Sequence, residues 1–352
     1  MIVEKIDIVL PWVDGNDPIW REKKEQYLLN SNELNNEDRY RDWDNLHFIF
    51  RGIEEFMPWI NNVFFITYGH LPKWLNTNHS KLKIIKHEDY MPKEFLPTFS
   101  SHSIELNLHR IKNLSEKFIY FNDDFFILKP IRKEEFFKNN LPVDMAIMDM
   151  AHDGIIRHID SNNIDIISKN HNRHISPKLV KRRIVLDNFS KWFNLGYGKY
   201  NFQNLLLMYF RFFTGFKINH HPQSYLKSTF NNVWEIEKEL LEKVSQNKFR
   251  TNEDVNQYLF RYWQLVKGNF VPANKKNFID ARAFGVIRTL ENANQISKDI
   301  KSNRYKFYCI NDGTSIGRFT KESISQENFK LSKILINQSL EKILPKKSSY
   351  EI

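Results

Sequence analysis

The sequence predicts an α/β protein built on a mainly parallel, Rossmann-like sheet with a helical insertion or subdomain. Strand-like apolar runs occur at residues 6–10, 63–67 and 118–121, and the last run has no polar alternation, which is typical of a strand buried on both faces. Segments with apolar residues at helical spacing separate these runs. Because strands that alternate with helices favour a parallel sheet, the three observations together predict the fold class.

The first run leads into residues 11–18, which are dense in Asp, Asn, Gly and Pro and therefore predict a loop at the carboxyl end of the strand. Ligands of open α/β sheets bind at that edge. Trp12 is thus a candidate for stacking on a nucleotide base, and Asp14 or Asp17 for bonding a ribose. A capped turn before a helix that starts near Ile19 explains the same residues equally well.

A helix is expected over residues 46–56, where apolar residues recur at helical spacing and form a core-facing stripe. Arg39, Arg41 and Arg51 lie in or just before it and are candidates for phosphate contacts, because a guanidinium group is a fixed bidentate donor. Taken singly, each arginine is more often one partner of a surface ion pair.

A third strand is expected at residues 82–85, and a further helix ends near Leu114. On that helix Glu105 and His109 are four residues apart and share a face, with Arg110 adjacent. Spacing alone favours an ordinary solvated helix face at these positions.

The run at 118–121 ends in three short side chains with oxygen atoms: Asn122, Asp123 and Asp124. A strand that ends this way places hard oxygen ligands in the crevice where Mg²⁺ or Mn²⁺ could hold a diphosphate. A polar turn that stops the strand is the alternative, with about even odds, because short motifs often match by chance.

The character of the chain changes after a predicted strand at 143–148. Residues 151–200 are rich in His, Arg, Lys and Asn, with an amphipathic helix over 177–193. Residues 201–216 are apolar but too short to span a bilayer, so they form either a buried or an interfacial helix, and we favour the buried one. Helices are expected over 234–244 and from a cap at Thr251 or Asn252 through Trp263.

A strand at residues 305–310 ends in Asn311 and Asp312, a second Asn-Asp pair that a common turn would also explain. Residues 331–347 predict an amphipathic helix and a basic, solvated tail. The expected organisation is a nucleotide-sugar-binding half over 1–150, a mostly helical acceptor and catalytic region over 151–300, and a closing strand, second Asn-Asp pair and tail over 301–352.

Composition restricts the class of protein. The 352 residues carry a formal net charge of +10, which favours anionic partners, although a lysine-rich surface is also common without one. The single cysteine, Cys309, excludes an intrachain disulfide framework and fits a reducing compartment. With no 18-residue apolar stretch and no signal peptide in the sequence, we expect a cytoplasmic protein, soluble or peripheral at the inner face of the plasma membrane.

Several ordered segments resemble the Stealth family of sugar-1-phosphate transferases. That family includes bacterial capsular polysaccharide phosphotransferases and the catalytic subunit of the animal lysosomal-enzyme N-acetylglucosamine-1-phosphotransferase. The match comprises residues 6–17; residues 39–124 with Pro58, Trp59, Phe99, Ser100, Ser101, Glu105, His109 and Arg110; His220, His221, Pro222, Arg250, Glu253 and Asp254; and residues 309–312. Residues 150–200 match poorly, so the resemblance leaves acceptor recognition open.

The resemblance implies a GT-A-like arrangement of the sheet and the transfer of a hexose-1-phosphate from a nucleotide sugar. The expected donor is UDP-N-acetylhexosamine, the acceptor is a hydroxyl of a growing capsular or surface polysaccharide, and a nucleoside monophosphate leaves. Such chemistry depends mainly on positioning and charge neutralisation. The alternative enzyme is a conventional GT-A glycosyltransferase that releases a nucleoside diphosphate. A nucleic-acid-binding protein has the right charge, but the sequence contains no recognisable groove-reading or base-stacking module.

The resemblance also implies roles for individual residues. Asp124 and Asp312 are the expected ligands of Mg²⁺ or Mn²⁺, and His220 is the expected general base, although Glu105 or another carboxylate could take that role. Arg250 is expected to stabilise charge on the transferred phosphate, unless it only pairs with Glu253 or Asp254. The expected catalytic set is Asp124, Glu105, His220 and Arg250, and the expected substrate-binding set is Trp12, Asp14, Arg39, Arg110, Asn122 and Asp123.

Overall fold

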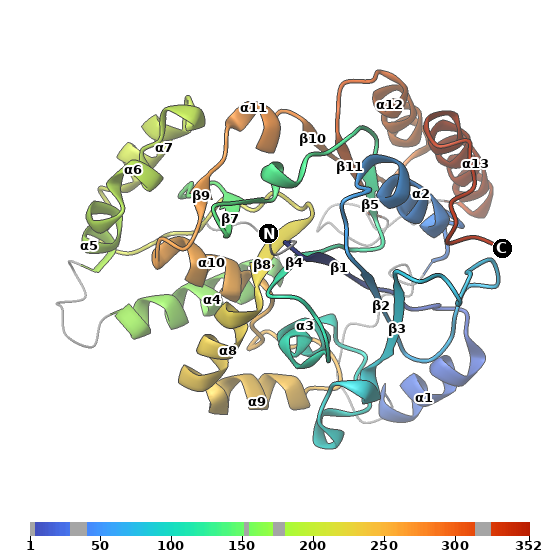
Figure 1. The fold of residues 1–352 in the computed structure, drawn as a ribbon. Coiled ribbons are helices and arrows are strands. Elements are labelled where there is room, and N and C mark those ends of the chain that lie inside the picture. Colours follow the sequence, from blue (N-terminus) through green and yellow to red (C-terminus); the bar gives the residue numbers. More distant parts are fainter. Residues whose placement is uncertain (1–3, 29–40, 151–154, 172–179, 314–324) are drawn as a thin grey trace.

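The computed structural model describes residues 4–28, 41–150, 155–171, 180–313 and 325–352. At its centre is a five-stranded sheet in the order β3-β2-β1-β4-β8 (Figure 1). Strands β1 to β4 are parallel to one another, and only β8 is antiparallel, to β4, which confirms the mainly parallel α/β fold. The strand bounds are Ile6–Pro11 (β1), Val63–Thr67 (β2), Leu82–Lys86 (β3), Lys117–Tyr120 (β4) and Gln223–Leu226 (β8).

Two smaller sheets flank the central one. One has the order β10-β11-β5 and the other the order β6-β7-β9. Their bounds are Arg282–Ile287 (β10), Phe307–Asp312 (β11), Phe125–Ile127 (β5), Phe137–Lys138 (β6), Leu141–Asp144 (β7) and Val271–Pro272 (β9). The predicted strand at 143–148 is therefore wrong beyond Asp144, where only Met148 makes an isolated bridge, to Phe216.

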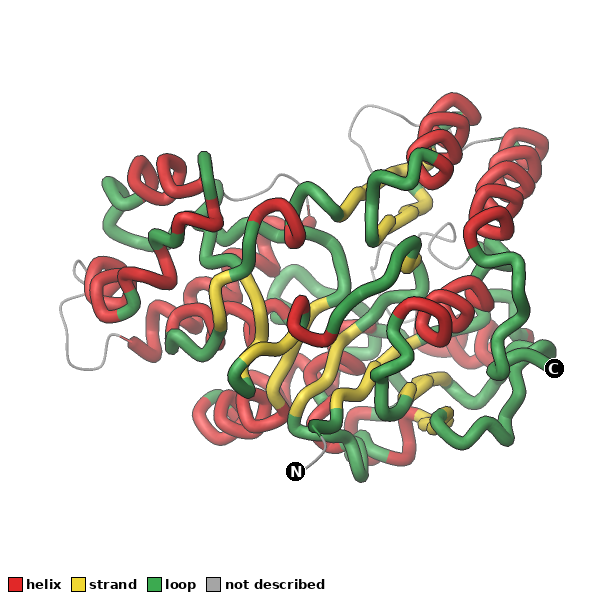
Figure 2. Tube along the Cα trace, turned by 45° about the horizontal axis from the view of Figure 1, so that its top comes forward, coloured by secondary structure: helices red, strands yellow, loops and turns green. Residues whose placement is uncertain are grey.

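Helices cover both faces of the central sheet (Figure 2). Residues that alternate along a strand enter different cores: Val9 packs in one apolar cluster, and Ile8 and Leu10 pack in the other. The helices are α1 (Pro18–Leu28), α2 (Leu46–Phe56), α3 (Ser101–Leu106), α4 (Ile155–His171), α5 (Val180–Asp187), α6 (Phe189–Trp192), α7 (Tyr200–Leu207), α8 (Lys227–Ile236), α9 (Lys238–Gln246), α10 (Tyr258–Val266), α11 (Lys275–Phe278), α12 (Leu290–Lys301) and α13 (Gln326–Ile343).

The predicted helix over residues 104–114 is wrong in length, because α3 ends at Leu106 and a single 3-10 turn, Leu108–Arg110, follows it. Asn107 explains the break. Its buried side-chain amide donates to the carbonyl oxygen of Ser103 and to Ser245 Oγ, and this local hydrogen bonding competes with helix continuation. Glu105 and His109 therefore do not share one helical face.

Two other predictions are corrected. The apolar segment 201–216 is not a buried helix, because α7 leaves Phe202, Leu205 and Leu206 exposed. The basic residues Lys346 and Lys347 are exposed as expected, and beyond them the side chain of Tyr350 is buried and lies near Phe50 of α2, with ring centroids 5.3 Å apart. The helix expected from Thr251 begins only at Tyr258, because Thr251 bonds Asp254 in a turn of its own.

Candidate active site

Asp124 lies at the junction of two sheets, between the end of β4 in the central sheet and the start of β5 in the small one. Strand β11 fixes this junction, because Cys309 is paired with Phe125 and the N–H of Ile310 donates to the carbonyl oxygen of Asp124 at 3.0 Å. The carboxylate that the sequence placed at a strand end is therefore held by backbone pairing from both sheets.

His220 reaches Asp124 because β8 runs antiparallel to β4. Gln223, the first residue of β8, is paired with Tyr120, the last residue of β4, so residues just before β8 meet residues just after β4. Nε2 of His220 lies 3.8 Å from Oδ2 of Asp124. The imidazole ring contacts Phe125 and Phe284 edge-on, at centroid distances of 5.2 and 5.8 Å, and these contacts orient it.

Cys309 completes a group of three side chains with Asp124 and His220, whose donor atoms lie within 4.8 Å of one another. The Cys309 thiol is buried and donates to Oδ2 of Asp124 at 3.3 Å. Burial and the neighbouring Asp124 charge raise the pKa of this thiol well above its ordinary value. It is therefore a neutral hydrogen-bond donor and not a thiolate.

The donor set fits a hard divalent cation held by oxygen atoms. Oδ1 of Asp124 is buried and makes no hydrogen bond among the described residues, so it has lone pairs available for a ligand. Mg²⁺ and Mn²⁺ prefer carboxylate oxygens, whereas a zinc site of Asp, His and Cys would require the thiolate form of Cys309. The oxygen of Asp124 therefore supports the expected Mg²⁺ or Mn²⁺ more than it supports zinc.

Asp123 directly precedes Asp124, and its side chain is exposed, so a cation can reach it. Desolvation raises the pKa of its carboxyl group, and the charges of Asp124 and Asp42 raise it further. A cation bound between Asp123 and Asp124 would offset the repulsion between the two neighbouring carboxylates.

Asp312, the expected partner ligand, is not one of the three residues whose donor atoms converge in the described part of the chain. It lies three residues beyond Cys309 on β11, and its Oδ2 is 3.8 Å from Nη1 of Arg41. The ion pair brings an arginine next to the carboxylates. Arg39, expected to bind the nucleotide, lies outside the described residues, so its role stays a prediction.

Arg250 is exposed beside the start of α3, where its Nη2 donates to Oγ of Ser101 at 2.6 Å. The turn that carries it is fixed by Asp254, which accepts from Thr251 and lies 2.8 Å from Nδ1 of His102. Burial would raise the pKa of Asp254, but the hydrogen bonds from His102 and Thr251 outweigh it and lower that pKa. Arg250 therefore does not pair with Asp254, and its guanidinium is open to a ligand.

The side chain of Glu105 is buried. Its Oε1 accepts from the hydroxyl of Tyr120 at 3.1 Å, and its Oε2 accepts from the N–H of Gln257 at 3.3 Å. Burial raises the pKa of Tyr258, the residue after Gln257, and the charges of Glu105 and Asp124 raise it further. The fold therefore brings Tyr258 within the influence of both carboxylates, and no sequence motif indicated this residue.

The loop after β1 lies at the carboxyl edge of the sheet, as expected. The Trp12 ring stacks on Phe65 at 5.6 Å and remains partly exposed. The N–H of Asp14 donates to Nε2 of His70 at 2.7 Å, and Oδ1 of Asp14 accepts from the N–H of Asn16. The capped turn therefore exists, and the partly exposed Trp12 stays a candidate for contact with a base.

Arg110 does not lie near Asp124, His220 and Cys309. Its guanidinium lies over the ring of Trp234 at 4.5 Å, and its Nε donates to Asn107. The neighbouring carbonyl of Ile111 accepts from Lys227, which follows the C-terminal end of β8, at the edge where β4 begins. Arg110 thus lies towards the amino edge of β4, opposite Asp124, and a substrate-binding role stays a prediction without geometric support.

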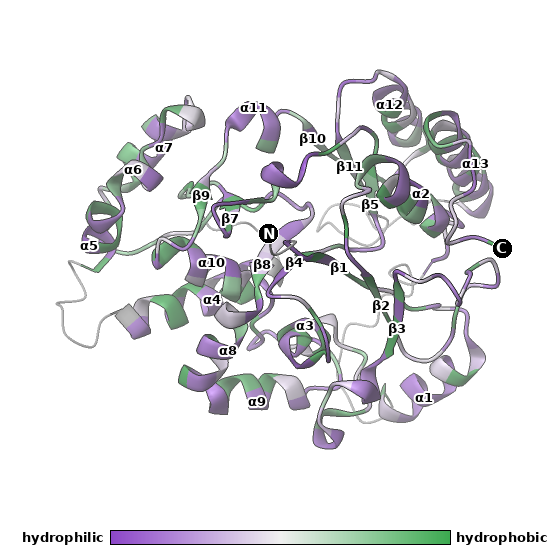
Figure 3. Ribbon diagram, in the orientation of Figure 1, coloured by the Kyte–Doolittle hydropathy of each residue, from purple (hydrophilic) through white to green (hydrophobic). Residues whose placement is uncertain are grey.

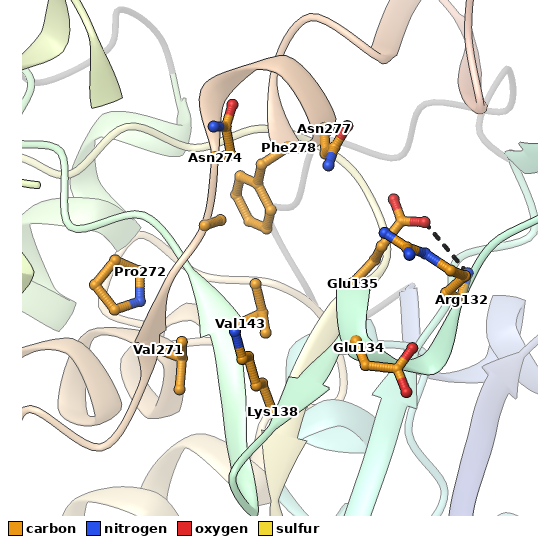
Figure 4. Close-up of a pocket in the computed structure, with 11 residues that line it drawn as sticks. Arg132, Glu134, Glu135, Lys138, Val143, Val271, Pro272, Asn274, Asn277 and Phe278 are labelled. Atoms are coloured by element: carbon orange, nitrogen blue, oxygen red, sulfur yellow. Dashed lines mark hydrogen bonds between the residues drawn. The ribbon is translucent and has the colours of Figure 1, made fainter. Parts of the chain in front are cut away.

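A cavity of about 380 Å³ lies elsewhere, between the turn at Glu134 and Glu135 and α11 (Figure 4). Its lining includes Arg132, Lys138, Val271 and Phe278, and none of the residues grouped around Asp124. Charges of both signs line it, and Glu135 is already bonded to Lys306. The residues described above therefore lie outside this cavity.

Two family models match the chain: Stealth protein conserved region 1 over residues 4–32, and conserved region 2 over residues 39–144. The capsular polysaccharide phosphotransferase WcwK of Streptococcus pneumoniae is 41% identical over 352 residues, which cover 99% of this chain and 100% of the relative. The chain belongs to the Stealth family. Another similar protein is the receptor polysaccharide phosphotransferase WefC of Streptococcus gordonii, 36% identical over 361 residues and over the full length of both chains.

Among solved structures, the galactosyltransferase LgtC covers 97% of this Stealth chain and 98% of its own, with 8% identity and a TM-score of 0.40. Likeness at that level supports no argument about activity. In the described part of this Stealth protein, no helix combines the length and the hydropathy needed to cross a bilayer.

Proposed function

We propose that this Stealth protein transfers a hexose-1-phosphate from a nucleotide sugar to a hydroxyl group of a growing surface polysaccharide. The product is a phosphodiester, and a nucleoside monophosphate leaves. The observation that carries the proposal is the convergence of Asp124, His220 and Cys309 at the junction of the two sheets, in a chain similar over its whole length to polysaccharide phosphotransferases.

The chain's own residues supply distinct parts of the reaction. His220 Nε2 accepts the proton of the attacking hydroxyl, and the Asp124 carboxylate 3.8 Å away stabilises the imidazolium that forms. Arg250, which bonds Ser101, and Arg41, which pairs with Asp312, are the two arginines that we assign to the negative charge of the transferred phosphate. Glu105 supports the site from below through Tyr120, and its assignment as a second catalytic carboxylate stays part of the proposal.

A divalent cation, Mg²⁺ or Mn²⁺, would be held by Asp124 with Asp123 or Asp312, and it would neutralise charge on the diphosphate of the donor. Asn122 supports the same loop, since its carbonyl oxygen accepts from the N–H of Phe125. Trp12 and Asp14, with Arg39, form the proposed nucleotide side of the site. We propose UDP-N-acetylhexosamine as the donor class.

The deciding experiment incubates the protein with Mg²⁺, a polysaccharide acceptor and a panel of nucleotide sugars, and identifies the released nucleotide. We expect a nucleoside monophosphate and a phosphodiester-linked product. Release of a nucleoside diphosphate would instead identify a conventional glycosyltransferase.

The matched variants for this experiment are Asp124→Asn and Asp187→Asn. The first removes the carboxylate charge at the junction of the sheets and should abolish turnover with an unchanged fold, because an amide of the same shape still accepts the bond from Cys309. The second changes an exposed aspartate of α5 and should leave turnover unchanged. Near-normal activity of Asp124→Asn at saturating Mg²⁺ would contradict the metal assignment.

A further inference from the structure

The segment from α5 to the turn after α7 exposes an unusual concentration of large apolar side chains. Of the sixteen exposed large hydrophobic residues in the described part of the chain, nine lie between residues 186 and 212. We call these nine the apolar patch: Leu186, Phe189, Leu195, Phe202, Leu205, Leu206, Tyr209, Phe210 and Phe212. Helices α5 to α7 lie at one edge of the molecule (Figure 1), and green hydrophobic stretches alternate with purple hydrophilic ones along α6 and α7 (Figure 3).

The segment that carries the apolar patch is packed against the rest of the protein through other side chains. Trp192, Leu207 and Phe213 of the same segment are buried in the large apolar core. Helix α7 buries Asn204 and Leu207 against the protein and exposes Phe202, Leu205 and Leu206 on its outer side. Large apolar side chains gathered on an exposed surface mark an interaction site, so the outer side of α7 is expected to meet a partner.

The patch has a fixed shape. Nζ of the buried Lys181 donates to the carbonyl oxygens of Leu207, Phe210 and Phe212, which close the last turn of α7 and the turn after it. The backbone under the exposed aromatic rings is thus held in place by the protein itself. Docking would require little further ordering of the chain.

The exposed charges around the patch identify the partner. Between residues 180 and 217, the exposed charged side chains are Arg182, Arg183, Lys199 and Arg211 against one acid, Asp187. Asp187 is itself paired with Arg183, its Nε 2.9 Å away. Exposed leucine and aromatic side chains in the same segment as exposed arginine and lysine match an interface with acyl chains and anionic headgroups.

The patch is also connected to the candidate active site. Phe213 and Phe216 anchor the chain in the core directly after the patch, and His220 follows four residues after Phe216. A surface bound at residues 202–212 would therefore be linked by a short, anchored segment to the group at Asp124.

We propose that the apolar patch and its surrounding basic residues dock this protein onto the surface of an anionic lipid bilayer. Docking is peripheral: the aromatic and leucine side chains enter the boundary between headgroups and acyl chains, and the basic side chains contact the headgroups. The docking surface stands apart from the proposed transfer reaction, because membrane binding is measured without any substrate.

The test sediments the full chain with vesicles of equal parts phosphatidylglycerol and phosphatidylcholine, and with vesicles of phosphatidylcholine alone. We expect binding to the anionic vesicles that weakens with salt. Arg182→Gln/Arg211→Gln should weaken it about 30-fold, since each basic residue near such a surface contributes about 1 kcal/mol. Leu205→Gln/Leu206→Gln should weaken it by about tenfold or more, because two exposed leucines no longer enter the bilayer.

Two double variants on the opposite side of the chain serve as controls. Leu331→Gln/Ile334→Gln removes two exposed apolar residues of α13, and Lys298→Gln/Lys330→Gln removes two exposed charges of α12 and α13. Both should bind vesicles as the parent does, and circular dichroism should show that all four variants are folded.

Three results would overturn the proposal. The first is no binding to the anionic vesicles. The second is binding that Leu205→Gln/Leu206→Gln leaves unchanged, which would indicate charge attraction alone. The third is a concentration-dependent dimer, measured by light scattering, that this variant abolishes while vesicle binding is absent, which would assign the patch to a second copy of the chain.

Discussion

Cys309 could act at the site as a neutral hydrogen-bond donor or as a thiolate ligand of a metal ion, and substitutions separate these two roles. Its neutral thiol donates to Asp124, and a serine hydroxyl at the same position would donate in the same direction. We therefore expect Cys309→Ser to retain Mg²⁺-dependent turnover. Cys309→Ala leaves Oδ2 of Asp124 without this bond and should cost about 1 kcal/mol of the free energy of unfolding.

Turnover of the three proteins with Mg²⁺ and with Zn²⁺, together with urea unfolding, checks this expectation. Inactive Cys309→Ser in a folded protein, or a parent enzyme active only with Zn²⁺, would show instead that the sulfur binds the metal as thiolate.

The raised pKa of Asp123 gives the site a pH dependence. The carboxyl group, with an ordinary pKa of 3.8 and a raised value of about 7, retains its proton to higher pH than usual. The proton competes with a cation, so the affinity for Mg²⁺ should weaken as pH falls through this window. Because the folded protein binds the extra proton, the contribution of Asp123 to stability is present below 3.8 and is lost as pH rises towards 7.

Titration of Mg²⁺ at several pH values checks the first effect, and Asp123→Asn should remove most of the pH dependence while weakening binding. Mg²⁺ affinity in the parent protein that is the same at pH 5 and pH 8 would count against Asp123 as part of the cation site. The control variant Asp280→Asn changes an ion pair with Lys275, and its affinity for Mg²⁺ should depend on pH as that of the parent does.

At the scale of elements, Glu105 links α3 to β4 and to the start of α10. Its two oxygens accept from Tyr120 and from the N–H of Gln257. Glu105→Gln turns an NH₂ group towards one of these donors, so we expect a loss of about 1–3 kcal/mol in the free energy of unfolding. Glu242→Gln, which breaks only an exposed pair with Lys238, should change it by less than about 0.5 kcal/mol.

Denaturant unfolding and turnover, measured on the same samples, separate the two roles of Glu105. A folded variant of parental stability that has lost turnover would favour direct action on the substrate. A less stable variant whose turnover at low temperature is close to the parent's would favour positioning.

Strands β1, β2 and β4 and helix α2 were predictable within a residue, because their apolar patterns are local and continuous. The break after α3 was not predictable, since it depends on a hydrogen bond between Asn107 and distant Ser245. The exposure of α7 was not predictable either, because apolar composition does not reveal whether a face meets a core or a membrane.

The candidate site was predictable only in part, because its residues come from distant parts of the sequence. Asp124 and His220 lie in segments that resemble the Stealth family, but the sequence alone does not show that they meet. The antiparallel pairing of β8 with β4 brings them together. Tyr258 had no pattern at all, and the ion pair of Arg41 with Asp312 joins residues 271 positions apart. Contacts of this range depend on the whole fold.

At the scale of the whole molecule, Arg51 joins helix α2 to the C-terminus. Its Nε and Nη1 bond Glu351 at 2.9 Å and Glu341 at 2.8 Å, and Arg51 is buried, so it is neither a phosphate ligand nor a surface ion-pair partner. Arg51→Met leaves the nearly buried Glu351 uncompensated and should cost about 3–5 kcal/mol in unfolding free energy.

Thermal and denaturant unfolding check this value, with Arg183→Met as the control. Arg183 forms an exposed pair with Asp187, and its loss should cost less than about 0.5 kcal/mol. If Arg51→Met unfolds at the same denaturant concentration as the parent protein, the C-terminal segment contributes little to the stability of the fold.

The antiparallel pairing of β8 with β4 has one more consequence. The chain leaves the central sheet after Tyr120 and re-enters it at Gln223, and these two residues are paired with each other. Everything between them begins and ends at one point, and the entropy of closing such a loop grows only slowly with its length. Evolution could therefore lengthen, shorten or exchange the part of the chain between Asp124 and His220, the bilayer-facing helices included, while the distance between these two residues stays the same.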